Sequence, residues 1–270
     1  MKNNFKVIVS DIDCTITRTD HTISKRTLDT ISKIKEAGYL FGLASGRPID
    51  DLLRRYEEWG LKDQFDFIIA WNGCQLYDND TKEIYKYNYL TKDELKEIIE
   101  FMSQFDISVN IYKPNKYVTN KESNRAWYSA FRNKRELVIE EDLSKYYDEE
   151  SGGIMFRTTL EDMPRIEEVT KEFVKDKNYI GFKTQNDLME FSNKDCSKGY
   201  VLKKYLELKN IPAEQCLAIG DTSNDNDLLS TCYGVCMENG SADTKTLAKE
   251  ITEFGCDEDG FADYMEKHLL

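Results

Sequence analysis

Two hydrophobic patterns alternate along the first third of the chain. Short, largely apolar runs predict buried strands, and these runs are 5–10, 39–44 and 67–71. Segments with apolar residues every three or four positions predict helices, and these segments are 28–34 and 52–56. Gly38 and Gly60 follow the two segments, as is typical of helix ends. Strands that alternate with helices indicate a parallel sheet covered on both faces.

The pattern changes after position 75. Residues 75–89 predict a hairpin, and Thr91 with Glu94 predicts a capping box at the start of a helix. Further strands are expected at 108–112, 116–118, 153–158, 179–184 and 187–192. Further helices are expected at 163–174 and in a charged stretch that reaches about Tyr147. Hairpins mixed with helices indicate an α+β module with an antiparallel sheet.

The alternation of strands and helices returns at Lys198. Helices are expected at 198–208, 225–229, 244–251 and 260–269, and strands at 216–219 and 234–237. The whole pattern predicts an α/β fold with a Rossmann-like parallel sheet and an inserted α+β domain. We assign 1–75 and 193–270 to the discontinuous core and 76–192 to the insertion.

Acidic residues follow two of the predicted core strands. Asp11 and Asp13 come directly after the first strand, and Asp221 and Asp225 follow strand 216–219. Carboxylates gathered in one cleft favour a hard cation with oxygen ligands, and Mg²⁺ is the obvious candidate. A carboxylate can also attack phosphorus, while a second one transfers the proton. Taken alone, Asp11 and Asp13 are more typical of a solvated loop or a helix cap. Asp221 and Asp225 could also cap a helix, but Gly220 before them and Asn224 beside Asp225 favour a role near a metal.

Three further segments carry residue types that bind phosphate. Ser45, Gly46 and Arg47 precede a helix N-terminus, which is a favourable place for an anion. Lys198 opens a helix, and Asn224 lies within the second acidic segment. In open parallel sheets, ligands bind at the carboxyl ends of the strands. One phosphoryl-transfer site assembled from these distant segments is therefore the natural interpretation.

The order of these motifs resembles that of the haloacid dehalogenase-like hydrolases, specifically the Cof-type phosphatases of subfamily IIB. The resemblance runs from Lys6 to about Phe261 and is dense in the core motifs. It also includes Asn72-Gly73 and the stretch 235–240. It implies a type 2 cap, of the class C2B, between the Ser45 and Lys198 motifs. It further implies a Mg²⁺-dependent phosphatase that acts on a small phosphorylated metabolite, such as a sugar phosphate.

The resemblance also implies a role for each motif residue. Asp11 would be the nucleophile and a Mg²⁺ ligand, and Asp13 the general acid and base with a metal-binding carbonyl. Asp221 would complete the protein ligands, supported by Asp225. The phosphoryl group would be bound by Ser45, Gly46, Arg47, Asn224 and Lys198, and Lys198 would also offset the carboxylate charge. Substrate identity would depend on residues of the insertion, with these candidates: Asn110, Tyr112, Arg157, Lys183 and Asn186.

One position departs from the family pattern, and three other functions fit parts of it. Cys14 stands where the family usually has Gly, so a positive φ there would be strained. A phosphomutase would reuse the aspartyl-phosphate, and a receiver-like regulatory domain would hold it without turnover. An inactive binding relative is disfavoured because every catalytic residue type is present.

The composition narrows the class of partner. The formal net charge is −13, which argues against nucleic acid or an anionic membrane, because both need clustered Lys and Arg. No apolar stretch approaches the roughly 20 residues of a membrane helix, and no signal peptide is expected. We therefore expect a cytoplasmic monomer or homodimer. Seven cysteines form no recognisable framework, so reduced thiols are expected.

Overall fold

The structure is a computed structural model that describes residues 4–61, 64–144 and 149–270. The chain divides into two compact units. The core unit consists of Met1–Tyr87 and Ser197–Leu270, and the inserted unit consists of Asn88–Cys196. Within the described ranges, no helix is long and apolar enough to cross a membrane.

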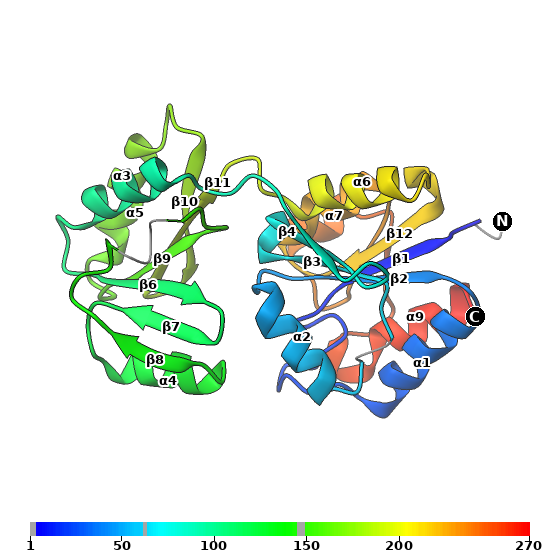
Figure 1. The fold of residues 1–270 in the computed structure, drawn as a ribbon. Helices are drawn as coiled ribbons and strands as arrows, with labels where there is room; N and C mark the ends of the chain where they lie inside the picture. The colour runs from blue at the N-terminus through cyan, green and yellow to red at the C-terminus, as the bar shows by residue number, and fades with distance from the viewer. Residues whose placement is uncertain (1–3, 62–63, 145–148) are drawn as a thin grey trace. The chain divides into compact units, whose positions relative to one another are not determined.

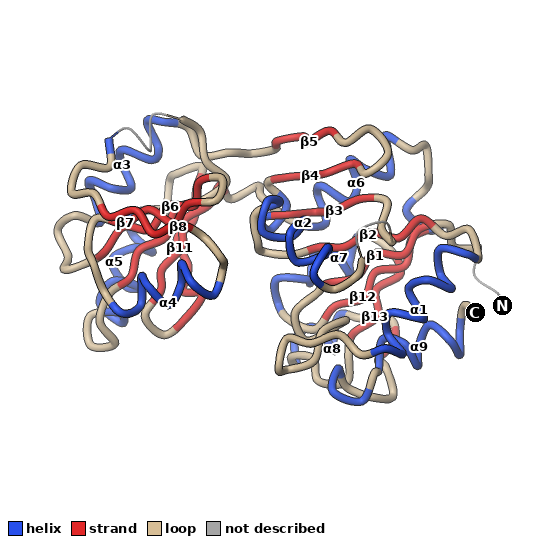
Figure 2. Tube along the Cα trace, turned by 60° about the horizontal axis from the view of Figure 1, so that its bottom comes forward, coloured by secondary structure: helices blue, strands red, loops and turns tan. Residues whose placement is uncertain are grey.

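The core unit is built on one sheet (Figures 1 and 2). Its strands are β1 (Val7–Asp11), β2 (Leu40–Ala44), β3 (Phe67–Ala70), β4 (Gln75–Asp78), β5 (Glu83–Lys86), β12 (Cys216–Gly220), β13 (Tyr233–Cys236) and β14 (Glu250–Ile251). They lie in the order β14-β13-β12-β1-β2-β3-β4-β5. The strands from β14 to β3 are parallel, and the pairs β3–β4 and β4–β5 are antiparallel. The predicted parallel sheet is thus confirmed.

Helices cover both faces of this sheet, as the continuous apolar runs predict. They are α1 (Lys25–Glu36), α2 (Ile49–Glu58), α6 (Lys198–Leu208), α7 (Asn226–Thr231), α8 (Ala242–Leu247) and α9 (Gly260–His268). Apolar residues of α1, α2 and α9 pack around Ile8 and Phe41. Those of α6 and α7 pack around Val7 and Val9 on the other face. Every residue of β1 is buried in consequence.

The hairpin of β4 and β5 belongs to the core unit, because β4 pairs with β3. We expected the insertion to span 76–192, whereas the units change at Tyr87–Asn88 and at Cys196–Ser197. The sequence pattern of a hairpin indicates that two strands pair with each other. It does not show that the pair extends the edge of a neighbouring parallel sheet.

The inserted unit holds a second sheet. Its strands are β6 (Ser108–Lys113), β7 (Lys116–Thr119), β8 (Glu136–Ile139), β9 (Ile154–Arg157), β10 (Tyr179–Gln185) and β11 (Leu188–Asn193). They lie in the order β10-β11-β9-β6-β7-β8, with only β7–β8 parallel. Helices α3 (Lys92–Met102) and α5 (Met163–Phe173) pack on the face that carries Val118. Helix α4 (Asn124–Arg132) packs against Tyr117 on the other face. The capping box of Thr91 and Glu94 is confirmed.

Two expected helices end earlier than predicted. The charged stretch stops being helical at Arg132, and β8 follows it beside β7; residues 145–148 lie outside the described ranges. The predicted helix 244–251 ends at Leu247, because Glu250 and Ile251 pair with β13. In both places pairing with an existing strand outweighs local helical preference.

Candidate active site

Three of the predicted motifs lie where neighbouring core strands end. Strand β1 lies between β12 and β2 and runs parallel to both. Asp11 is the last residue of β1, Ser45 directly follows β2, and Asp221 directly follows β12. Because parallel neighbours end at one edge of a sheet, these side chains are brought to one place.

Three carboxylates form a buried cluster at this edge. One carboxylate oxygen from each of Asp11, Asp221 and Asp225 lies within 4.8 Å of the other two. Burial, reinforced by Asp225, holds the pKa of Asp11 well above its usual range. Burial and Asp225 also raise the pKa of Asp221 to about 7. Ionisation of all three carboxylates is therefore unfavourable unless positive charge lies close to them.

Lys198 supplies part of that charge. Its ammonium donates to Asp11 Oδ1 and to Asp225 Oδ1, each at 2.6 Å, from a side chain that is 1% exposed. Burial opposes the charged form, but the two carboxylates raise the pKa of Lys198 above its usual value. The first residue of α6, far along the chain, is thus fixed against the end of β1.

Asp225 is held by the loop around it as well as by Lys198. Its Oδ2 accepts from the backbone N–H of Asp221 at 3.1 Å and of Thr222 at 3.3 Å. A Cβ at Gly220 would lie 2.6 Å from that same oxygen, so the loop requires glycine there. Both carboxylate oxygens of Asp225 are therefore held by protein groups, and Asp225 supports the other residues of the cluster.

Asp13 lies outside the carboxylate cluster and pairs with Arg47. The guanidinium donates from Nε to Oδ2 at 3.3 Å and from Nη2 to Oδ1 at 3.2 Å. His21 Nδ1 lies 3.5 Å from Oδ1. Burial works to raise the pKa of Asp13, but the charge and hydrogen bonds of Arg47 leave that pKa lowered. Arg47, predicted as a phosphate ligand, is engaged with the predicted general acid here.

The Ser45 segment is a tight loop beside the cluster. Ser45 is buried, and its Oγ accepts from the Arg47 N–H at 3.3 Å. A Cβ at Gly46 would lie 3.0 Å from Asn72 Oδ1, which explains the small residue. Asn224, by contrast, is exposed and accepts from Thr222 Oγ1 at 2.6 Å. Lys198 donates to Asp225, and the role of Asn224 as a phosphate ligand stays a prediction.

The donor set of the cluster fits a hard divalent cation. Asp11, Asp221 and Asp225 offer only oxygen, as Mg²⁺ prefers. Lys198 pairs with two of the three carboxylates, and no described Lys or Arg forms a salt bridge with Asp221. A buried carboxylate that has no Lys or Arg partner is suited to bind a metal ion.

Two residues that support the site, Asp51 and His21, were not predicted from the sequence. Buried Asp51 accepts from Arg54 and Arg55 and lies 3.6 Å from Arg47, so it anchors the arginine that holds Asp13. The signal for it, an acid four residues after Arg47 on a helix, was present in the sequence. His21 carried no local signal, because only the fold brings it to Asp13.

Cys14 has φ of 60°, the strained conformation that the sequence suggested. Its carbonyl accepts from Asn239 Nδ2 at 3.0 Å, and Asn239 Oδ1 accepts from the Cys256 N–H at 2.8 Å. Five cysteines are free, but Cys74 and Cys196 are disulfide-bonded, which corrects the expectation of reduced thiols. Within the core unit, a Cβ at Gly73 would lie 2.0 Å from the carbonyl oxygen of Ser197, so this position requires glycine.

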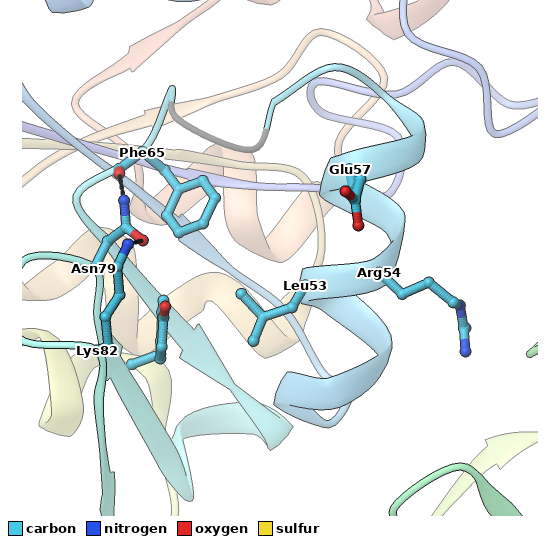
Figure 3. Close-up of a pocket in the computed structure, with 7 residues that line it drawn as sticks. Leu53, Arg54, Glu57, Phe65, Asn79 and Lys82 are labelled. Atoms are coloured by element: carbon cyan, nitrogen blue, oxygen red, sulfur yellow. Dashed lines mark hydrogen bonds between the residues drawn. The ribbon is translucent and has the colours of Figure 1, made fainter.

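A separate pocket of about 290 Å³ lies on the core unit between α2 and the β4–β5 turn (Figure 3). Two of its polar lining residues contact other lining residues, since Asn79 donates to the Phe65 carbonyl at 2.9 Å and accepts from Lys82 at 2.7 Å. None of the predicted site residues lines it. The carboxylate cluster therefore stays the candidate site.

The predicted substrate-contacting residues of the inserted unit lie on both faces of its sheet. Asn110 accepts from Tyr117 Oη at 2.7 Å, and Arg157 donates to Asp187 at 2.9 Å. Lys183 instead lies 3.1 Å from Glu167 of α5, on the face covered by helices. Lys183 therefore lies on the opposite face of the sheet from Asn110 and Arg157, because alternate residues of a strand point to opposite faces.

Comparison with known proteins agrees with this geometry. Residues 8–265 match the family model of haloacid dehalogenase-like hydrolases. The chain is 25% identical to phosphatase YwpJ of Bacillus subtilis, covering 98% of this chain and 100% of that protein. It is 24% identical to 5-amino-6-(5-phospho-D-ribitylamino)uracil phosphatase YitU of the same species, covering 97% of each. A haloacid dehalogenase-like hydrolase from Bacteroides thetaiotaomicron superposes with a TM-score of 0.88 at 26% identity, over 97% of this chain and 99% of that one. The chain therefore belongs to the haloacid dehalogenase-like hydrolases.

Proposed function

We propose that the protein is a Mg²⁺-dependent phosphatase that hydrolyses a small phosphorylated metabolite through an aspartyl-phosphate on Asp11. The observation that carries this proposal is the buried cluster of Asp11, Asp221 and Asp225 with Lys198 against it. Asp11, Asp221 and the Asp13 carbonyl would hold the metal, with Asp225 in support. Bound Mg²⁺ would offset the charge of the carboxylates and of the phosphoryl oxygens.

The residues divide the reaction into two displacements. Asp11 attacks phosphorus while the bond to the leaving oxygen breaks, and Asp13 gives that oxygen a proton. Asp13 then takes a proton from the water that attacks the aspartyl-phosphate, which frees phosphate and Asp11. Asp13 carries the proton for the leaving oxygen when the substrate binds, and Arg47 stabilises the ionised form that its transfer leaves and that the second step needs. Lys198 favours the ionised form of Asp11 and stabilises charge on the transferring group.

We further propose that the core unit carries the chemistry and that the inserted unit determines the substrate. The proposal is supported by the location of every cluster residue in the core unit and by the separate compactness of the inserted unit. YitU is named for a phosphorylated ribityl compound. A hydroxyl-rich phosphate, such as a sugar or polyol phosphate, is the substrate class we favour.

The proposal is tested by phosphate release from nitrophenyl phosphate and a panel of sugar and polyol phosphates. Each assay is run with Mg²⁺ and with EDTA. We expect release that requires the metal and a substrate ranking within the panel. Absence of release from every compound with Mg²⁺ would contradict the proposal, and isomerisation of a sugar phosphate that requires a bisphosphate activator would indicate a phosphomutase.

A further inference from the structure

Two free thiols of the core unit lie on loops from opposite ends of the chain. Cys14 belongs to the loop that follows β1 and comes directly after Asp13. Cys256 opens the short helical turn Cys256–Glu258. Cys256 is part of the hydrophobic core around Ile8, and Cys14 packs against that same core. The fold therefore brings both thiols to one place.

Asn239 joins the two loops. Its Nδ2 donates to the Cys14 carbonyl at 3.0 Å, and its Oδ1 accepts from the Cys256 N–H at 2.8 Å. The next residues are joined as well, since the Thr19 N–H and Oγ1 each donate to Asp257 Oδ1 at 3.0 Å. The two thiols are thus carried by backbone segments that are fixed to each other.

The thiols of Cys14 and Cys256 also interact directly. A side-chain hydrogen bond joins them, and each affects the pKa of the other. Two sulfurs bound to one tetrahedral zinc ion lie roughly 3.8 Å apart, as follows from Zn–S bonds of about 2.3 Å. Thiols in contact can therefore bind one ion with little movement of the loops that carry them.

The surroundings of this thiol pair are acidic. Burial raises the pKa of Cys14 to about 12, and the charges of Asp221 and Asp13 add to the effect. Burial, followed by the charge of Asp257, raises the pKa of Cys256. Reactions of a free thiolate, such as oxidation, are disfavoured in consequence. The same negative charge attracts a cation, and an ion that binds sulfur displaces the thiol proton.

A second thiol pair of the core unit shows what distinguishes this one. Cys216 and Cys232 also share a side-chain hydrogen bond, but Cys216 is fully buried, and only burial and Cys232 act on its pKa. Cys14, by contrast, is half-buried beside the exposed Asn239. The pair of Cys14 and Cys256 thus combines an opening to solvent with acidic neighbours, which the other pair lacks.

We propose that Cys14 and Cys256 bind a thiophilic divalent cation, of the class of Zn²⁺ and Cd²⁺, with solvent completing its coordination. Thiolate sulfur is a soft ligand that selects such ions over Mg²⁺, so this site differs in its chemistry from the carboxylate cluster. Binding forms two metal–sulfur bonds and releases both thiol protons to solvent. The inference goes beyond the proposed function and does not depend on it, because neither thiol takes part in phosphoryl transfer.

The test is a titration of the full chain with Cd²⁺ in the presence of excess Mg²⁺, which competes for the carboxylate cluster. Cadmium–thiolate bonds absorb in the ultraviolet, whereas cadmium bound to carboxylates does not. We expect this absorption to saturate at about one equivalent of Cd²⁺ in the wild type. In Cys14→Gly and in Cys256→Ser, the apparent Kd should rise by more than the roughly hundredfold that loss of a residue behind a metal ligand costs. The control is Cys232→Ser, which should bind as the wild type does.

Absence of the absorption from the wild type would overturn the inference, as would equal binding by the wild type and Cys14→Gly. Loss of binding in Cys232→Ser would place the ion at the other thiol pair. Circular dichroism shows whether each variant is folded, and Cys14→Gly suits the φ of 60° at that position. Zn²⁺ should also raise the melting temperature of the wild type but not that of Cys14→Gly or Cys256→Ser. An equal rise in these variants would contradict the site.

Discussion

Lys198 Nζ lies 2.6 Å from Asp11 Oδ1, although 187 positions separate the two residues in the chain. The same ammonium reaches Asp225 at the same distance. One lysine among three carboxylates leaves two negative charges without compensation. This balance makes the site fit a divalent cation and a phosphoryl group, and it makes Lys198 the residue that connects fold and chemistry.

Replacement of Lys198 should damage both stability and activity. Lys198→Met leaves Asp11 and Asp225 buried without their cation, and removal of one partner from a buried ion pair costs about 3–5 kcal/mol. Urea unfolding measures that loss. Lys203→Met is the matched control, because Lys203 is exposed on the same helix. Equal stability of the two variants would contradict the ion-pair account.

Mg²⁺ should stabilise the folded protein through the carboxylate cluster. A cation that binds only the folded state raises the melting temperature as its concentration rises. We expect this increase in the wild type and its loss in Asp221→Asn. Asp257→Asn, a change at an exposed carboxylate of the core unit, should keep it. An undiminished increase in Asp221→Asn would place the cation elsewhere.

Arg47 should affect catalysis more than substrate binding. Its guanidinium forms two hydrogen bonds with Asp13, a geometry that the single ammonium of lysine cannot reproduce. Arg47→Lys should therefore lower kcat by about tenfold or more, the scale of a misplaced general acid and base, with little change in KM. Arg26→Lys is the control, because Arg26 pairs with Glu266 of α9 and not with the site residues. A rise in KM at constant kcat would instead support the phosphate-binding role that the sequence suggested.

Stability should depend on pH through Glu190. The pKa of Glu190 is raised from 4.5 to about 7 in the folded state, so the folded protein binds the proton more tightly than the unfolded chain. The free energy of unfolding should therefore fall as the pH rises from about 4.5 through 7, by up to about 3 kcal/mol. Glu190→Gln should lose this part of the dependence and be more stable than the wild type at pH 8. If the free energy of unfolding depended on pH equally in the wild type and in Glu190→Gln, the raised pKa of Glu190 would be contradicted.

Cys14→Gly should keep phosphatase activity. The φ of 60° at Cys14 is a conformation that glycine adopts without a steric penalty, and the backbone contact with Asn239 does not need the thiol. Steady-state kinetics on nitrophenyl phosphate provides the comparison. Loss of most activity would show that the thiol has a role in the reaction.

The strand ends of the core site could be predicted from the sequence because each motif follows a continuous apolar run. Asp11, Ser45 and Asp221 lie at the carboxyl ends of parallel strands, which is where open α/β sheets bind their ligands. Lys198 could be placed only through the family resemblance, since nothing local distinguishes it from other lysines. The hairpin of β4 and β5 was predicted as a hairpin but assigned to the wrong unit, because its partner β3 is not part of the local pattern.

Other features depend on contacts that no local pattern records. The pairing of Arg47 with Asp13 joins two loops, and the position of His21 depends on the same fold. The disulfide-bonded state of Cys74 and Cys196 could not be read from their spacing. Glu190 looks like an ordinary polar residue of an alternating strand until its burial is known.

The central claim is that Asp11 carries the phosphoryl group during turnover. Rapid acid quenching of the enzyme with Mg²⁺ and substrate, followed by peptide mass spectrometry, tests it most directly. We predict a phosphoryl adduct on the peptide that contains Asp11. The Asp11→Asn variant should show neither this adduct nor phosphate release. Steady phosphate release by Asp11→Asn, or an adduct on another residue, would contradict the account.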